Sequence, residues 1–123
     1  MSALSYPSHG TAPLSPTAKF LLAEFLFIAF NALDALFTAV YVGVGVATES
    51  NPLLAAAIAI SPVLFVTVKM TLAIVAVVIL HTLRNHRGAQ QVMIGGALAY
   101  AGVVGWHLVH LPIGLPVAIA SLP

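Results

Sequence analysis

The chain has 123 residues, of which 61% are hydrophobic and 6% are charged, and its mean hydropathy is +1.10. This composition is typical of an integral membrane protein, and the length suits a single domain. The formal net charge of +1 offers no basic surface for nucleic acid, and the absence of cysteine excludes disulfides, thiolate metal sites and a cysteine nucleophile.

Residues 1–18 are rich in serine, proline and alanine, and they predict an irregular extension ahead of a membrane domain over residues 19–123. They lack the basic region of a signal peptide, because no Lys or Arg precedes Lys19. The apolar run that follows is long and contains acidic residues. We therefore expect it to form an uncleaved spanning helix over about residues 20–46.

Three apolar segments are long enough to cross a bilayer, whose hydrocarbon core requires about 20 helical residues. They cover residues 20–46, 62–83 and 92–111. We expect the last one to end at Pro112, because proline interrupts a helix. The apolar tail over residues 113–123 is too short to span.

Residues 53–60, between the first two spans, are apolar but also too short to cross. Asn51 and Pro52 precede them and suit the cap and the first position of a helix. We expect a short interfacial helix here, and a longer second span kinked at Pro62 is the alternative. The predicted fold is therefore all-α, with three transmembrane helices and one short helix between the first two.

Few positive charges are available to set the orientation of the spans. Arg84 and Arg87 lie in the loop after the second span, and Lys19 precedes the first. Positively charged loops stay in the cytoplasm. We therefore expect a protein of a prokaryotic inner membrane, with a cytoplasmic N-terminus, an external C-terminus and Glu49 on the outer side.

Two of the predicted spans carry a narrow polar stripe, each within an arc of about 80° at 100° per residue. The stripe of the first span consists of Glu24, Asn31, Asp34 and Thr38. The stripe of the third span consists of Gly96, Tyr100, Val103, His107 and His110. Polar stripes in a membrane are expected to face another helix rather than lipid.

Counting the helical rise places three ionisable residues at one depth, roughly 20 Å from the cytoplasmic end. These are Asp34, Lys69 and His107, with Asn31 and Thr38 beside them in an intramembrane polar layer. An aspartate at mid-bilayer costs roughly 2.5 to 3.5 kcal/mol, so a partner is expected. The layer is either a neutral ion pair that fixes the helix register or a site for a solute, a proton or a metal.

The spacing His107-x-x-His110 can place two imidazoles on one helix face, as in metal sites of helical bundles. Asp34 or Glu49 would supply a further ligand, and the metal itself is undetermined. Alternatively, one of the histidines ligates haem or a chlorophyll-type pigment. The structural alternative is an interfacial pair next to Trp106.

Small residues form two strips on the third span, Gly95, Ala99 and Gly102 in one and Ala101 and Gly105 in the other. Small residues permit close approach of helices in a membrane. We therefore expect self-association or contact with other membrane protein subunits, in addition to the lipid bilayer.

Three short motifs combine rare intramembrane charges in a fixed order: Asn31-x-x-Asp34-x-x-x-Thr38, Glu49-x-Asn51-Pro52 and Phe65-x-x-x-Lys69. Over residues 20–83 this pattern resembles a family of small prokaryotic multi-pass membrane proteins that is catalogued only as a domain of unknown function. The resemblance implies the fold and brings no activity with it. The His-x-x-His pair lies outside the matched part.

These observations lead to three functional hypotheses. The first is an accessory or structural subunit of a larger membrane complex of respiratory, photosynthetic or monooxygenase type. The second is an oligomeric ion-coupled transporter in which Asp34 and Lys69 are the coupling pair. The third is a metal-binding membrane protein or enzyme. No nucleophile motif, phosphate-binding glycine loop or carboxylate pair supports catalysis, so the sequence favours a non-enzymatic role without deciding it.

Overall fold

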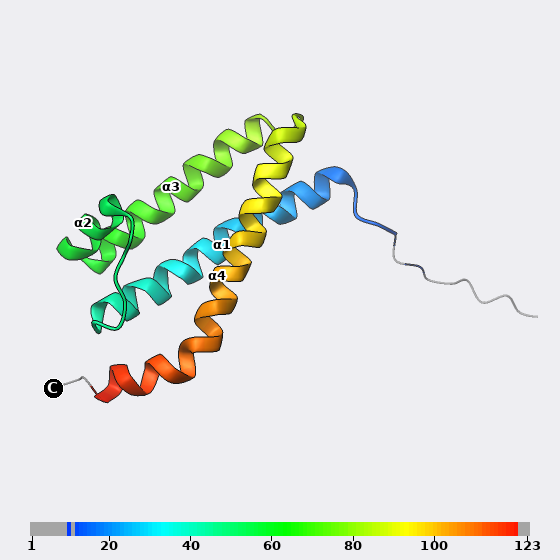
Figure 1. The fold of residues 1–123 in the computed structure, drawn as a ribbon. Coiled ribbons are helices and arrows are strands. Elements are labelled where there is room, and N and C mark those ends of the chain that lie inside the picture. Colours follow the sequence, from blue (N-terminus) through cyan, green and yellow to red (C-terminus); the bar gives the residue numbers. More distant parts are fainter. Residues whose placement is uncertain (1–9, 11, 121–123) are drawn as a thin grey trace, which may run out of the picture.

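The structure, a computed structural model, describes residue 10 and residues 12–120, and this part of the chain is all-α. Its helices are α1 (Pro16–Gly43), α2 (Pro52–Ile60), α3 (Pro62–Thr82) and α4 (Arg87–Ala120) (Figure 1). The helices α1 and α3 and the Arg87–His110 part of α4 are long and apolar enough to cross a membrane. The prediction of an all-α membrane protein with three spans and one short helix is confirmed.

The bounds of α1 differ from the prediction at both ends. The helix begins at Pro16, inside the segment 1–18 that was expected to be irregular, because the Ser15 hydroxyl caps its first turn with a 3.1 Å hydrogen bond. It ends at Gly43, three residues early. Gly45 then adopts a φ of 73°, which is a conformation that favours glycine and typically follows a helix end.

The short helix α2 is separate from α3, so the alternative of one long kinked span is wrong. Asn51 caps α2, since its side-chain oxygen accepts a 3.0 Å hydrogen bond from the Leu53 amide. Ser61 then adopts an extended backbone (φ −166°, ψ 136°), and its hydroxyl accepts a 3.1 Å bond from the Val63 amide in α3. One residue therefore ends α2 and caps α3.

The prediction that the last span ends at Pro112 is wrong, because α4 runs through Pro112 and Pro116 to Ala120. A proline inside a helix removes one hydrogen bond and bends the axis without necessarily ending the helix. Figure 1 shows that α4 changes direction towards its C-terminal end. The predicted apolar tail is therefore helical as far as Ala120.

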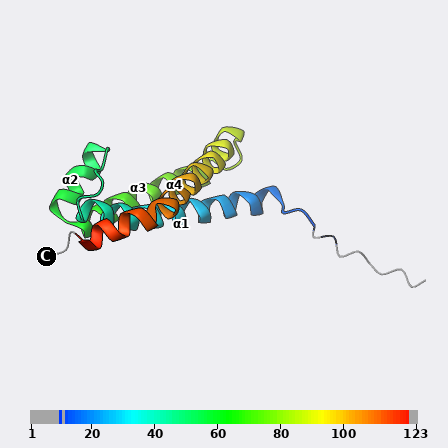
Figure 2. The ribbon, with the colours of Figure 1, turned by 60° about the horizontal axis from the view of Figure 1, so that its bottom comes forward.

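Helix α1 is the centre of the assembly, because it packs against both α3 and α4, which contact each other little. Figure 1 shows α3 alongside α1 and α4 crossing it. The short helix α2 packs on α3 and projects from one end of the three long helices (Figure 2). A side chain of α1 is therefore the best placed to contact both other spans.

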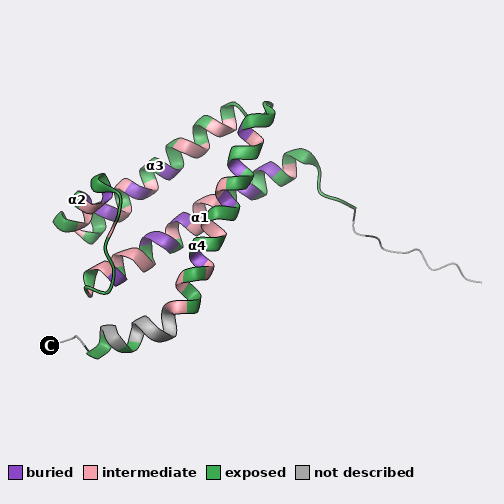
Figure 3. Ribbon diagram, in the orientation of Figure 1, coloured by how far each residue is buried: buried purple, intermediate pink, exposed green. Residues whose placement is uncertain are grey.

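Two small apolar clusters hold the helices together. At the start of α1, the buried members are Phe20, Ala23, Met93 and Ala97. Near its end, the buried members are Ala35, Leu54, Ala57 and Phe65. Most outward faces are exposed apolar surface (Figure 3), which is the arrangement that a lipid environment tolerates. Asn31 and Asp34 lie between these two clusters along α1, and Lys69 lies between them along α3.

Candidate functional site

Asp34 of α1 is bonded to side chains from both neighbouring spans. Its Oδ2 forms a 2.5 Å salt bridge with Lys69 Nζ of α3. Its Oδ1 lies 2.9 Å from His107 Nε2 of α4 and accepts a long 3.5 Å hydrogen bond from the Thr38 hydroxyl. Both carboxylate oxygens are thus occupied, and one residue joins all three spans.

The bonded groups are withdrawn from the surface. Asp34 is 6% and Lys69 is 8% exposed. The Lys69 ammonium also lies 5.5 Å from the centre of the Phe65 ring, a distance at which a cation is attracted to the aromatic face. In such surroundings the attraction between opposite charges is strong, and removal of either charge leaves the other unpaired.

Aromatic rings cover the histidine side of the network. The Phe37 and Tyr41 rings lie 5.4 Å and 5.6 Å from the His107 ring, measured between centroids. Tyr41 is buried, and its hydroxyl has no hydrogen-bond partner among the described residues. His107 therefore contacts three side chains of α1, namely Asp34, Phe37 and Tyr41.

Asn31 lies one turn before Asp34 and belongs to the same layer without bonding to the carboxylate. It is 2% exposed, and its amide donates a 2.9 Å hydrogen bond to the Phe27 carbonyl. The structure thus brings Asp34, Lys69, His107 and Thr38 into direct contact. Asn31 instead faces an adjacent cavity.

This cavity has a volume of about 400 Å³ and is partly open. Its polar lining comes from Asn31, Glu49, Asn51, Lys69 and Tyr100, and the remaining lining is mainly aliphatic. Lys69 therefore borders the cavity and contacts Asp34 at the same time. The lining thus consists of five polar or charged and five apolar side chains.

Glu49 reaches the cavity from the loop before α2 rather than from a span. Its Oε1 accepts a 2.8 Å hydrogen bond from the Asn51 amide, which fixes the loop next to the cap of α2. Glu49 and Lys69 give the cavity lining one negative and one positive side chain. The sequence indicated Glu49 as a ligand from the loop but gave no sign of the cavity.

Of the residues considered as metal or pigment ligands, the structure brings His107 and Asp34 into contact and places His110 and Glu49 elsewhere. His110 contacts Trp106 of its own helix, with ring centroids 3.9 Å apart and its Nδ1 2.9 Å from the Trp106 carbonyl oxygen. His107 bonds to Asp34 instead, and Glu49 bonds to its own loop. Among the described residues, no three histidine or carboxylate side chains are grouped as metal ligands.

A second polar pair escaped the sequence analysis. His81 Nδ1 of α3 lies 2.7 Å from Glu24 Oε1 of α1, near the end of the molecule that carries the α3–α4 loop. Counting the helical rise from Asp34 and Lys69 could have predicted this pair. Glu24 lies ten residues before Asp34 and His81 twelve residues after Lys69, so antiparallel helices bring them level.

Comparison with known proteins identifies the family but no activity. No curated protein and no solved structure matches the chain. The family match extends beyond the resemblance seen over residues 20–83 and includes both His107 and His110. Residues 25–113 match the model described as "Domain of unknown function (DUF5658)", so the chain belongs to that family of uncharacterised proteins, as its motifs predicted.

Proposed function

We propose that the protein is an ion-coupled carrier, working as an oligomer, which moves a small acidic solute together with a proton. The observation that carries this proposal is the position of Lys69, which contacts Asp34 and borders the polar cavity. A salt bridge that served only to fix helix register would need no such cavity. Carriers commonly bind their solutes near the middle of the membrane.

Charge balance suggests how the solute and the proton are coupled. In the empty site the negative charge of Asp34 is balanced by the positive charge of Lys69. A carboxylate that enters the cavity competes with Asp34 for the Lys69 ammonium. Asp34 would then be an unpaired buried charge, which is strongly unfavourable. One proton taken up at His107, which is bonded to Asp34, would restore neutrality, so one proton accompanies a solute with a single negative charge.

The other polar groups of the cavity have roles that follow from their chemistry. The amides of Asn31 and Asn51 and the hydroxyl of Tyr100 can donate hydrogen bonds to solute oxygens. Glu49 can bind a cationic or hydroxyl group of the same solute. A small carboxylic acid with a second polar group fits this set of donors and acceptors.

Proteoliposomes that contain a pH-sensitive dye test the proposal. Lactate, succinate and glutamate are added outside in turn, and uptake of the radiolabelled acid is measured alongside internal acidification. We expect coupled uptake and acidification for at least one acid. His107→Gln should abolish the acidification, whereas His110→Gln, the same change one turn further along α4, should preserve it.

Two results would contradict the carrier proposal. One is the absence of uptake for every acid when the protein is folded and reconstituted in both orientations. The other is equal acidification by wild type and by His107→Gln, because the proposed proton would then not reside on that side chain.

A second candidate function, an accessory subunit of a larger membrane complex, is favoured by the glycines of α4. Gly96 packs against Phe27, but a Cβ atom built at Gly95, Gly102 or Gly105 would meet nothing within 4 Å. Within the described part of the chain these three glycines therefore face open space, which leaves room for close approach of another helix. A haem, pigment or metal carried by such a partner would be reached by His110 more easily than by His107, which is bonded to Asp34.

Native mass spectrometry from mild detergent distinguishes the two functions. A subunit should be recovered with a different membrane chain, and Gly102→Leu should release it. The carrier should be recovered with copies of itself. A persistent monomer without cofactor that retains its biological effect would exclude the subunit.

We further propose that the protein resides in a prokaryotic inner membrane with the α3–α4 loop in the cytoplasm. Lys19, Arg84 and Arg87 lie at this end, which fits the preference of positive charge for the cytoplasmic side. The polar cavity then opens near the outer side. Single cysteines at Ser50 and Gly88 should react with an impermeant thiol reagent from opposite sides, and reaction from one side would refute this topology.

A further inference from the structure

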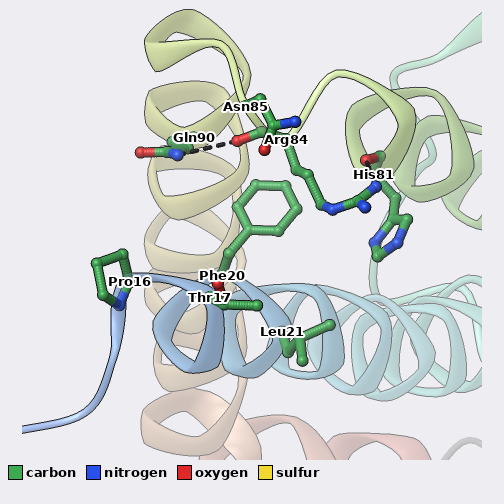
Figure 4. A pocket seen from close by; sticks show the side chains of 8 residues that line it. All are labelled: Pro16, Thr17, Phe20, Leu21, His81, Arg84, Asn85 and Gln90. Atoms are coloured by element: carbon green, nitrogen blue, oxygen red, sulfur yellow. Dashed lines mark hydrogen bonds between the residues drawn. The ribbon is translucent and has the colours of Figure 1, made fainter.

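A second cavity lies at the opposite end of the molecule from the α2 loop. Its volume is about 250 Å³, and it is enclosed by the start of α1, the end of α3 and the loop to α4 (Figure 4). The polar lining residues are Thr17, His81, Arg84, Asn85 and Gln90. Phe20 and Leu21 supply apolar lining from α1.

Arg84 is held in position at this cavity by two hydrogen bonds. Its Nη1 donates a 3.0 Å bond to the His81 carbonyl, and the Gln90 amide donates a 2.9 Å bond to the Arg84 carbonyl. Figure 4 shows the Arg84 side chain extending past the Phe20 ring towards His81. The guanidinium keeps further N–H donors that these bonds do not use.

The positive charge of Arg84 has no carboxylate partner among the described residues, since each described salt bridge involves Asp34 or Glu24 with another cation. A smaller cavity of about 140 Å³ adjoins the first, sharing Phe20 and Gln90, and adds Lys19 to its lining. The two cavities share Pro16, Phe20 and Gln90, and we call them together the groove, with Arg84 in its larger part and Lys19 in its smaller part.

The groove also has an apolar lining. Leu21 and Ile94 line it and are 48% and 44% exposed. Because the groove lies at the ends of three membrane-spanning helices, its basic rim falls at the depth of lipid headgroups and its apolar part at the depth of acyl chains. A soluble anion would contact only the basic side chains of the rim and not Leu21 or Ile94.

We propose that this groove binds an anionic phospholipid, with the phosphate at Arg84 and an acyl chain against Leu21, which lines the same cavity. The fork of N–H groups on arginine matches phosphate oxygens, and charge-assisted bonds of this kind are strong. Lys19 in the adjoining cavity adds positive charge close to the phosphate. This site is independent of the carrier proposal.

Native mass spectrometry of the full chain, titrated with lipid in detergent, tests the proposal. The probes are phosphatidylglycerol, phosphatidylcholine and inorganic phosphate. We expect phosphatidylglycerol to bind at least tenfold more tightly than phosphatidylcholine. Arg84→Gln should weaken phosphatidylglycerol binding roughly tenfold, as expected for loss of a charge-assisted bond.

Arg87→Gln is the matched control, because Arg87 lies three residues after Arg84 at the start of α4 and has the same charge but lines neither cavity. We expect this variant to bind phosphatidylglycerol within about twofold of wild type, as a surface charge far from the ligand contributes little. Equal loss in both variants would overturn the proposal, since the attraction would then be diffuse. Inorganic phosphate binding as tightly as phosphatidylglycerol would overturn the assignment to lipid, and circular dichroism verifies that each variant is folded.

Discussion

The described part of the chain contains two pairs of a carboxylate and a histidine, both with the carboxylate on α1, and they differ in their surroundings. The His107 side chain, bonded to Asp34, is 18% exposed, whereas the His81 side chain, bonded to Glu24, is 42% exposed. Asp34 also binds Lys69. The first pair is part of a three-helix network, and the second is an isolated contact near a helix end.

This difference shows that burial and the number of partners, rather than residue type, decide the energetics of a polar pair. The buried network must keep its charges balanced, because water cannot screen an unpaired group there. The Glu24–His81 contact lies partly at the surface, where water and salt screen it and its contribution is small. The network therefore links all three spans, whereas the outlying pair links only α1 and α3.

The largest effect is expected from Lys69→Met, which removes one charge of the network and keeps an apolar side chain of similar length. It leaves Asp34 without a cation, and breaking a buried pair in this way costs about 3–5 kcal/mol. Unfolding in mixed detergent micelles measures the loss. Lys19→Met is the control, since Lys19 is exposed, and comparable losses in both variants would contradict the comparison.

A smaller effect is expected from Gly96→Leu, which disturbs the contact of α1 with α4 between the two regions. A Cβ atom at Gly96 would lie 3.0 Å from the Phe27 ring, so the Phe27 side chain must shift to admit a leucine. Overpacking of this kind costs about 1–3 kcal/mol.

Gly95→Leu provides the matched control for this substitution, because a Cβ atom at Gly95 would meet nothing within 4 Å. The stability of this variant in detergent should be unchanged, and the same unfolding measurement detects the difference. If both leucine variants were equally stable, Gly96 would not set the distance between the helices.

The smallest effect is expected from Glu24→Gln. The substitution removes the charge of the outlying pair but keeps a hydrogen-bonding group, so the loss should be at most about 1 kcal/mol. It should also shrink when salt is raised, because the pair is partly exposed. Asp34→Asn is the same chemical change in the network, and an equally small loss there would remove the distinction between the regions.

The fold could largely be predicted from the sequence because apolar runs and caps are local signals. Asn51-Pro52 and Ser61-Pro62 marked the starts of α2 and α3, and both caps are present. The end of α4 could not be predicted in this way. Whether a helix stops or bends at Pro112 depends on its surroundings as much as on the proline.

The contacts of the site were partly accessible to sequence reasoning. Counting the helical rise placed Asp34, Lys69 and His107 at one depth, and the structure has their side chains in contact. The cavity was inaccessible, because it depends on how the loop with Glu49 folds back over α1 and α3. The local sequence pattern contains no information on the path of this loop.

The central claim is that Asp34 and Lys69 stabilise each other within the network, and a double-mutant cycle tests it most directly. Unfolding free energies are compared for wild type, Asp34→Asn, Lys69→Met and the double variant in one detergent system. We predict that the double variant loses less stability than the two single losses combined, with a coupling of about 1 kcal/mol or more. Losses that add within about 0.5 kcal/mol would show that the two residues act independently and would contradict the account.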